Sequence, residues 1–497
     1  MDEQKKAYTS KEEIIAHARK FHPDDDMSVV EKAYDFAEKA HSGQKRKSGE
    51  PYFVHPTAVA VILADIMVDP DTIAAGLLHD VVEDCDGITI DVIGKTFGED
   101  IAAMVDGVTK LEKQDFLTKD AQKAEAMRKM FAAMAHETRV VFIKLADRLN
   151  NMRTLDTQSP ERRIPIARET LDIYAPLAHR LGVYRIKSEL EDLCLKYLEP
   201  AAYVDISRRL ESSREEHENW IKHVTEILKN ELPKQGIKNF TISGRVKHVY
   251  SIFNKMRAQN KEYDEIMDLV ALRIIVETYV ECYTAMGVVH GLWKAVDGKF
   301  KDYITSPKWG IYQSLHTTVM GEKHIFEVQI RTKKMHENAE FGIAAHWRYK
   351  KGHSRDLDNQ LTWLNHIIDW TGETEDPDAF SNYLHTELFA REVCVYTPNG
   401  DVRMLPIGST PVDFAATIHK GLLYQCCGAR VNNKIVQLST PLKTGDVVEI
   451  IKAPNEKGPS YDWLGFVKTA AARRAIRSYR RAEERDSIYE RGKDAFE

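Results

Sequence analysis

The spacing of apolar residues changes along the chain and predicts that its parts are built differently. Up to about residue 196, apolar positions recur every three to four residues, for example over residues 29–39, 57–66, 121–138 and 168–181. That period predicts amphipathic helices. Between about residues 237 and 332, residues 268–276 and 324–331 have strand-like patterns, with helical segments between them. Alternating helix and strand predicts a mixed α/β unit.

The pattern changes again after this unit. Residues 346–386 are charged and interrupted by glycine and proline, which predicts a connector with one helix. Short apolar runs then recur at residues 393–397, 402–405, 429–431, 434–436 and 447–451, with turn residues between them. These runs predict a small β-rich module. A basic helix is expected to begin after Pro454.

These patterns predict a multidomain fold of α and α+β parts, and a length of 497 residues favours three or four domains. We expect an all-helical domain with connecting helices over residues 1–200 and a mixed-sheet domain over residues 201–345. A linker with a helix is expected over residues 346–388, a β-rich domain over residues 389–453, and the start of a helical domain over residues 454–497.

Charge and cysteine content exclude several broad classes. The net charge of -6 argues against a general nucleic-acid coat, although local basic pockets stay open. The six cysteines form no C-x-x-C pair, which favours reduced thiols over a zinc or redox site. The N-terminus lacks an apolar signal segment, and the longest apolar stretch, residues 59–68, is too short to span a bilayer. We therefore expect a cytoplasmic protein without a membrane partner.

The first candidate site combines two histidines with two aspartates on three predicted helices. His55 precedes a proline, His79 and Asp80 are adjacent, and Asp147 lies in the segment K-L-A-D-R. Imidazole and carboxylate ligands in this mixture suit Mn²⁺ better than a closed zinc site. A single His-Asp step is more often surface or capping chemistry, but the combined motifs are far rarer.

An acidic pair follows this His-Asp step. Glu83 lies four residues after His79, and Asp84 lies four residues after Asp80. On one helix all four side chains would share a side. Glu83 and Asp84 are therefore candidates to orient or deprotonate a water molecule beside the ion. The basic loop over residues 45–49 is a candidate to hold a phosphate or a base.

The second candidate site lies in the predicted α/β unit. Arg245, Lys247 and Lys255 occur close together in the sequence, as expected of a site for ATP phosphates. Asp268 begins one predicted strand, and Glu327 lies on the polar face of another, so these carboxylates are candidates for Mg²⁺ or a base. Tyr312 and His316 are candidates to stack on a purine and contact its phosphates. The alternative is a surface charge pattern on an ordinary sheet.

Together these motifs resemble the Rel/SpoT family of bacterial alarmone enzymes, specifically its long bifunctional members. The resemblance covers nearly the whole chain. It implies an N-terminal HD-type (p)ppGpp hydrolase, a nucleotidyltransferase-like (p)ppGpp synthetase, a β-grasp-like TGS domain and the start of a helical domain. Long members usually continue into further regulatory domains, so the chain is expected to be a C-terminally truncated member.

The resemblance implies a role for each matching residue. It makes His55, His79, Asp80 and Asp147 the Mn²⁺ ligands, Glu83 and Asp84 the pair that serves the attacking water, and Arg46, Lys47, Ser48, Asn151 and Thr154 the alarmone-binding residues of the hydrolase. In the synthetase it assigns Arg245, Lys247, Ser251, Lys255 and Arg273 to ATP, Lys308, Tyr312, His316 and Gln329 to the acceptor, and Asp268 and Glu327 to Mg²⁺ or base chemistry. The implied substrates are ATP, GDP or GTP, and (p)ppGpp.

The resemblance is incomplete at four places. The family's R-F-K-D motif reads K-F-K-D from Lys299, which keeps the basic character of bifunctional members. Its P-K-P-N motif reads P-K-W-G, and Trp309 with Gly310 removes the asparagine that helps to read guanine. Asn150 replaces a usual histidine. His419 of the TGS module is kept, but the run after it departs from the family.

Three hypotheses follow. The first is a bifunctional enzyme whose two sites are coupled through a conformational equilibrium, with residues 155–200 as the conduit. The second, motivated by Trp309 and Gly310, is a (p)ppGpp hydrolase with a weak or sensor-only synthetase domain. The third is a non-enzymatic adaptor for the ribosome or uncharged tRNA, which the Glu83–Asp84 pair argues against. Ribosome and uncharged tRNA also stay expected partners of the enzyme.

Overall fold

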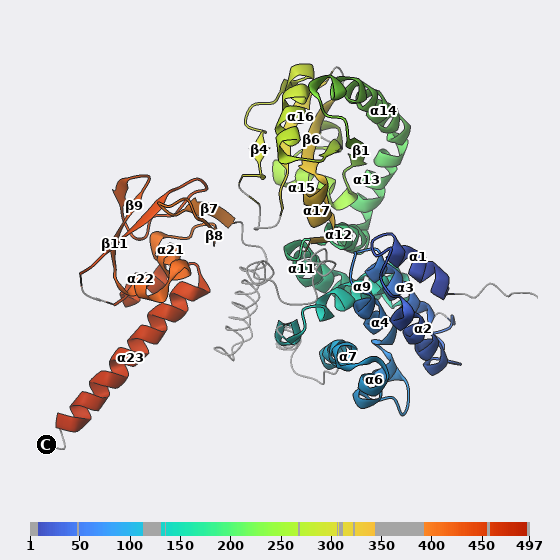
Figure 1. The fold of residues 1–497 in the computed structure, drawn as a ribbon, viewed down its shortest axis with the longest axis horizontal. Helices are drawn as coiled ribbons and strands as arrows, with labels where there is room; N and C mark the ends of the chain where they lie inside the picture. The colour runs from blue at the N-terminus through green and yellow to red at the C-terminus, as the bar shows by residue number, and fades with distance from the viewer. Residues whose placement is uncertain are drawn as a thin grey trace, which may run out of the picture. The chain divides into compact units, whose positions relative to one another are not determined.

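The computed structural model describes residues 8–46, 49–112, 131–134, 136–266, 269–305, 307, 312–321, 324–342, 392–454 and 458–494. The chain divides into two compact units, Met1–Leu361 and Thr362–Glu497 (Figure 1). Both candidate sites lie in the first unit. Within the described part of the chain, no helix combines the length and apolar character needed to cross a membrane.

The first part of this unit is helical because its apolar stripes pack against one another. Its described helices are α1 (Lys11–Arg19), α2 (Ser28–Ala40), α3 (Val54–Ala64), α4 (Pro70–Leu78), α5 (Val81–Asp84), α6 (Ile90–Phe97), α7 (Glu99–Glu112) and α9 (Val140–Arg153). The centre is formed by α3, α4 and α9, most of whose residues are buried. A central position lets side chains of these helices meet in an enclosed site.

A run of helices connects this part to the sheet. It comprises α10 (Pro160–Glu169), a π-helical turn (Thr170–Tyr174), α11 (Ala175–Arg180), α12 (Tyr184–Leu198), α13 (Pro200–Ser212) and α14 (Arg214–Glu231). On one side, α12 packs against α9. On the other, it packs against α15 (Val249–Gln259) and α17 (Lys333–Phe341) (Figure 1). This helix therefore contacts elements of both candidate sites.

The sheet of the first unit has the strand order β1-β2-β6-β5-β3, with β4 paired to β5. Its strands are β1 (Phe240–Val246), β2 (Val270–Val276), β3 (Lys294–Ala295), β4 (Lys301–Asp302), β5 (Leu315–Met320) and β6 (Ile325–Thr332). β2 and β6 are parallel, and the other pairs are antiparallel. The apolar face packs against α14 and α16 (Tyr279–Leu292). The opposite face is left for polar side chains.

The second unit is a small β-rich module followed by a long helix. It contains a hairpin of β7 (Glu392–Tyr396) and β8 (Val402–Pro406), and a sheet of β9 (Cys426–Val431), β10 (Lys434–Val436) and β11 (Val448–Lys452). Helices α21 (Pro411–Ile418), α22 (Lys420–Tyr424) and α23 (Ala470–Asp494) complete it. Buried Asp413 joins α21 to the segment before α23, because its carboxylate accepts bonds from Thr410 and from the backbone N–H groups of Lys468 and Thr469.

The predicted fold class is confirmed. A helical domain, a mixed sheet and a small β-rich domain follow one another, and β2 and β6 match the strands predicted over residues 268–276 and 324–331. β1, β5 and α21 lie where no element was predicted. The connector over residues 346–388 and most of the helix predicted over residues 121–138 lie outside the described residues. The domain boundaries stay a prediction.

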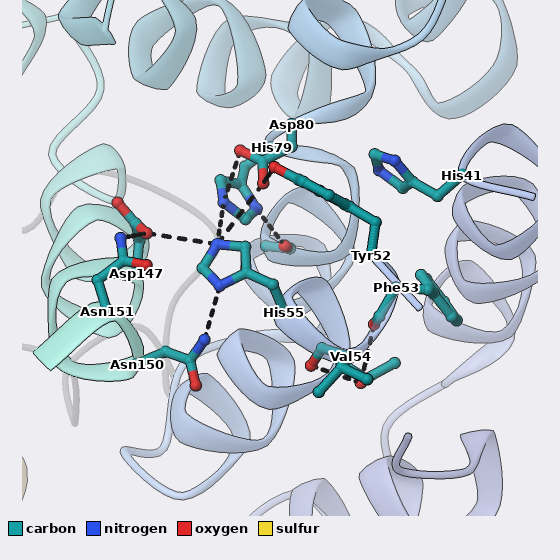
Figure 2. Close-up of polar contacts among 12 residues, drawn as sticks. His41, Tyr52, Phe53, Val54, His55, His79, Asp80, Asp147, Asn150 and Asn151 are labelled. Atoms are coloured by element: carbon teal, nitrogen blue, oxygen red, sulfur yellow. Dashed lines mark hydrogen bonds and ion pairs between the residues drawn. The ribbon is translucent and has the colours of Figure 1, made fainter. Parts of the chain in front are cut away.

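The proposed helix face over residues 79–84 is wrong in detail. α4 ends at Leu78, and α5 begins at Val81. The ring Nδ1 of His79 bonds to the carbonyl of Gly76 at 2.8 Å, a carbonyl that the end of α4 leaves without a helical partner. The N–H groups of Glu83 and Asp84 both donate to the carbonyl of Asp80, so the helix restarts there. The break turns His79 and Asp80 toward the centre of the domain (Figure 2).

Candidate active sites

The predicted metal ligands of the helical domain converge. His55 lies on α3, His79 and Asp80 lie at the break between α4 and α5, and Asp147 lies on α9 (Figure 2). Nε2 of His55 lies 3.2 Å from Nε2 of His79, 3.5 Å from Asp80 and 3.4 Å from Asp147. His55, His79 and Asp80 offer ligand atoms within 4.8 Å of one another. All four side chains are buried.

The hydrogen bonds around these residues fit a shared cation. Nδ1 of His79 donates to the Gly76 carbonyl, so the neutral form of the ring, the form that binds a metal ion, has its lone pair on Nε2. That lone pair faces Nε2 of His55 and, at 2.9 Å, a carboxylate oxygen of Asp80. Acceptor atoms crowded together in a buried space repel one another unless a proton or a metal ion lies between them. The donor set therefore fits a divalent ion.

Both aspartates are held in their charged form. Burial by itself would raise the pKa of Asp80, but His79 and His55 outweigh it and lower the pKa below its usual range. Burial opposes ionisation of Asp147 in the same way, and Lys144 with His55 more than offsets it. Lys144 lies 2.8 Å from one Asp147 oxygen. Two carboxylates that stay ionised at neutral pH are ready ligands for a hard cation.

The sequence patterns did not predict Tyr52 and Lys144 as neighbours of the ligands, and they marked Asn150 only as a departure from the family. Tyr52 donates its hydroxyl to Asp80 at 3.0 Å, and Lys144 pairs with Asp147. The Asn150 amide contacts Nδ1 of His55 at 2.6 Å. An amide offers a donor at one end and an acceptor at the other, so it suits either tautomer of the histidine. Partners of this kind orient metal ligands. Tyr52 lies three residues before His55, and Lys144 and Asn150 lie three residues before and after Asp147, so this spacing could have identified them.

The described part of the chain includes most of the other predicted hydrolase residues. Asn151 donates to Asp147 at 2.6 Å, and Thr154 ends α9 one turn later. Arg46 lies in the loop before α3, where its backbone bonds to Glu50. Half-buried Glu83 and exposed Asp84 lie on α5, directly after the ligands. Lys47 and Ser48 lie outside the described residues.

The second cluster lies on the polar face of the sheet around Glu327. Glu327 accepts from Nδ1 of His316 and from Gln329, each at 3.0 Å, and lies 3.6 Å from Lys247. Burial opposes its ionisation, but His316 and Lys247 lower its pKa below the usual range. Tyr312 contacts the other nitrogen of His316 at 2.6 Å. The structure thus brings together five predicted synthetase residues from two strands, β5 and β6, and two loops.

A cationic patch lies beside this cluster. Arg273 and Arg331 share the carboxylate of Glu340 on α17, at 2.8 and 3.2 Å. Burial and Arg273 lower the pKa of Arg331 to about 10, so it stays charged at neutral pH. Burial lowers the pKa of Arg273, and nearby Arg245 lowers it further. Three guanidinium groups around one carboxylate leave excess positive charge, which favours an anionic ligand. Glu340 was missed because it lies on a helix beyond the strand pattern.

The remaining synthetase residues are placed as follows. Ser251 and Lys255 lie one turn apart on α15, so they share a face. Lys301, of the K-F-K-D motif, pairs with His316 across β4 and β5. Asp268 and Lys308, together with Trp309 and Gly310, lie outside the described residues.

Comparison with known proteins agrees with this architecture. The sequence matches the HD domain over residues 33–184, the region found in RelA / SpoT proteins over residues 244–354, and the TGS domain over residues 393–452. It is 46% identical over 481 residues to GTP pyrophosphokinase of Myxococcus xanthus, covering 95% of this chain and 63% of that protein. It is 48% identical over 476 residues to the probable guanosine-3′,5′-bis(diphosphate) 3′-pyrophosphohydrolase of Synechocystis sp., covering 94% of this chain and 62% of that protein.

A third relative is matched over a larger share of its length. The bifunctional (p)ppGpp synthase/hydrolase RelA of Mycobacterium tuberculosis is 45% identical over 498 residues, which cover 98% of this chain and 67% of that protein. The chain spans less than two thirds of the first two relatives. With its helical domain, its mixed sheet and its β-rich module in the same order, the chain belongs to the RelA/SpoT family.

Proposed function

We propose that the chain is a bifunctional alarmone enzyme. Its helical domain removes the 3′-pyrophosphate of (p)ppGpp. Its sheet domain transfers the β,γ-pyrophosphate of ATP to the ribose 3′-hydroxyl of GDP or GTP and releases AMP. The names of the relatives, one a pyrophosphokinase, one a pyrophosphohydrolase and one bifunctional, support both halves.

The hydrolase half rests on the convergence of His55, His79, Asp80 and Asp147, the observation that carries the proposal. Mn²⁺ is the ion we propose, because two imidazoles and two carboxylates form a borderline-hard donor set. A bound divalent ion would lower the pKa of a water molecule and polarise the phosphoryl group. Glu83 and Asp84 would orient that water and take its proton.

Substrate binding in the hydrolase is assigned to residues around the ion. Asn151 and Thr154 at the end of α9 would contact the alarmone, and Arg46, Lys47 and Ser48 would bind it from the loop before α3. The cation of Arg46 suits a phosphate group, since guanidinium groups bind phosphate in a bidentate manner.

The synthetase half rests on the surroundings of Glu327. Glu327, with Asp268, would hold Mg²⁺ or take the proton of the ribose 3′-hydroxyl. Arg245 and Arg273 would enclose adenine, with Lys247, Ser251 and Lys255 on the ATP phosphates. Lys308, Tyr312, His316 and Gln329 would bind the acceptor nucleotide. The excess positive charge beside Glu327 supports an anionic donor such as ATP.

A second candidate is a (p)ppGpp hydrolase whose sheet domain only senses nucleotides. Trp309 and Gly310 favour it, because the P-K-W-G sequence lacks the asparagine with which the family helps to read guanine. In this case the domain would still bind ATP or GDP, but no product with a 3′-pyrophosphate would form.

One experiment with two variants tests both halves. His79→Ala should abolish metal-dependent (p)ppGpp hydrolysis while ATP plus GDP still gives the 3′-pyrophosphorylated product. Glu327→Gln should stop synthesis and spare hydrolysis. Activities are measured by chromatography of nucleotides, with Mn²⁺ or Mg²⁺ added, and thermal melting checks the fold.

If His79→Ala forms no product from ATP and GDP, the sensor-only alternative replaces the bifunctional proposal. If both variants lose both activities, the assignment of separate sites is wrong.

Location and macromolecular partners are also proposals. We place the protein in the cytoplasm, where its nucleotide substrates are found. The TGS match supports contacts with the ribosome and uncharged tRNA, made together with the further domains of longer relatives.

A further inference from the structure

A serine, a histidine and an aspartate are hydrogen-bonded in series where α12 meets α15. Oγ of Ser251 lies 2.7 Å from Nε2 of His248, and Nδ1 of His248 lies 3.1 Å from a carboxylate oxygen of Asp192. His248 and Ser251 belong to the beginning of α15, whereas Asp192 lies on α12. The bonds therefore join the connecting helices to the segment proposed to bind ATP phosphates.

Asp192 also holds the N-terminus of α15. The backbone N–H of Tyr250, in the first turn, donates to the same Asp192 oxygen at 2.7 Å. The residue before the helix, His248, makes no capping bond with its own side chain. A carboxylate from another helix thus takes the place of the usual cap and complements the positive end of the helix dipole. Asp192 fixes both the first turn of α15 and the ring of His248.

The proton count shows how these bonds affect Ser251. With Nδ1–H donating to Asp192, a neutral His248 has only a lone pair on Nε2, and it accepts the single hydroxyl proton of Ser251. A phosphate oxygen needs that proton as well. The hydroxyl can give this proton to only one acceptor at a time, so the ring of His248, fixed by Asp192, sets the orientation of the hydroxyl before ATP binds. The carboxylate of Glu191, which is paired with Lys187, lies 3.9 Å from the same Nε2.

We propose that Asp192 and His248 are positioning residues for the ATP triphosphate, acting through the hydroxyl of Ser251. They hold this hydroxyl on α15, which begins two residues after Lys247 and carries Lys255 one turn after Ser251. The inference rests on the proposed synthetase function and deepens it. The same three residue types form the nucleophilic group of serine hydrolases. Here the three residues lie beside the lysines proposed to bind ATP, so we assign Ser251 to phosphate binding rather than to nucleophilic attack.

The test uses isosteric variants and a control on the same helix. Asp192→Asn keeps the shape of the side chain and removes its charge. Glu189→Gln makes the same chemical change on α12, at a residue whose carboxylate pairs with exposed Arg153 at 2.6 Å. Ser251→Ala, alone and combined with Asp192→Asn, completes a double-mutant cycle.

The measurements are KM and kcat for ATP at saturating GDP. Asp192→Asn should raise KM for ATP roughly tenfold, as expected for one weakened charge-assisted hydrogen bond, and change kcat less than about twofold. In the Ser251→Ala background the same change should raise KM less than about threefold, because the hydroxyl through which Asp192 acts is gone. Glu189→Gln should leave KM for ATP unchanged. An equal rise in both backgrounds, or none in either, would overturn the proposal.

Binding without turnover separates this inference from the proposed activity. Calorimetry with α,β-methylene ATP should show weaker binding to Asp192→Asn. Glu189→Gln should leave this binding unchanged. Weaker binding to Asp192→Asn in a chain that makes no product would refute the synthetase function and keep the positioning role. Product formation without any effect of Asp192→Asn on ATP affinity would refute the positioning role and keep the function.

Discussion

At the scale of single residues, burial decides how the six cysteines behave. Burial raises the pKa of the Cys194 and Cys282 thiols to about 12 and that of Cys426 to about 11. Cys85 is shifted in the same direction, also by burial. Cys427 alone among the six is exposed. Since the thiolate is the reactive form, neighbouring Cys426 and Cys427 should differ strongly in reactivity.

A thiol-reactive disulfide reagent at pH 8 should therefore modify one cysteine rapidly. For a thiol with a pKa near 12, the thiolate is roughly one part in ten thousand at that pH, and burial slows access further. The absorbance of the released thiol, followed over time, measures this. Cys427→Ser should remove the fast phase, and unfolding in guanidinium should expose the remaining cysteines. A fast phase that survives Cys427→Ser would contradict the assignment.

At the scale of elements, a close contact of two backbones joins the end of α11 to the end of α17. Gly182 has a φ of +78°, and a Cβ added to it would lie 2.7 Å from Cα of Gly342. A Cβ on Gly342 would lie 2.0 Å from the carbonyl oxygen of Leu181. Only glycine permits this approach, which lets the loop before α12 pack directly on the helix that carries Glu340.

Gly182→Ala should consequently destabilise the first unit more than a positive φ alone explains. Gly298 provides the matched control, because its φ is +70° and nothing lies within 4 Å of an added Cβ. We expect about 1 kcal/mol for Gly298→Ala and roughly 2–4 kcal/mol for Gly182→Ala. Urea unfolding followed by circular dichroism measures both changes. Equal losses would show that the contact with Gly342 relaxes without cost.

At the scale of the whole first unit, α12 contacts both candidate sites. Glu189 pairs with Arg153 of α9, the helix that carries Asp147. Asp192 holds α15, and the ring of Tyr184 packs edge-on against Tyr312 with centroids 6.1 Å apart. A nucleotide that shifts α15 or Tyr312 would therefore also shift the support of α9. This geometry gives the predicted coupling of the two sites a physical route, and coupling would prevent synthesis and hydrolysis from wasting ATP together.

Saturating GDP with α,β-methylene ATP should lower kcat/KM of (p)ppGpp hydrolysis at least about fivefold, the lower end of typical coupling energies. Steady-state hydrolysis with and without both ligands measures the effect. Lys247→Gln, which weakens the proposed ATP site, should shift the inhibition to higher analogue concentration. Hydrolase kinetics that are untouched by both ligands in the unaltered chain would end the coupling hypothesis.

Local sequence patterns determined much of this protein. The period of three to four residues predicted the helical domain, and alternation over residues 324–331 predicted the face on which Glu327 and Gln329 lie. Residue types predicted which side chains would serve a divalent ion. These features were readable because helix and strand periods depend only on neighbours in sequence and on which face is buried.

Only the tertiary structure decided which partners those side chains meet. Three contacts join separate elements: Tyr52 bonds to Asp80, two arginines share Glu340, and Asp192 bonds to the first turn of α15. The end of α4 at Leu78 was likewise not predicted. No local period encodes such contacts, because they depend on how whole helices and strands pack. Sequence therefore determined the types and faces of the functional groups, and packing decided their distances, charge states and connections.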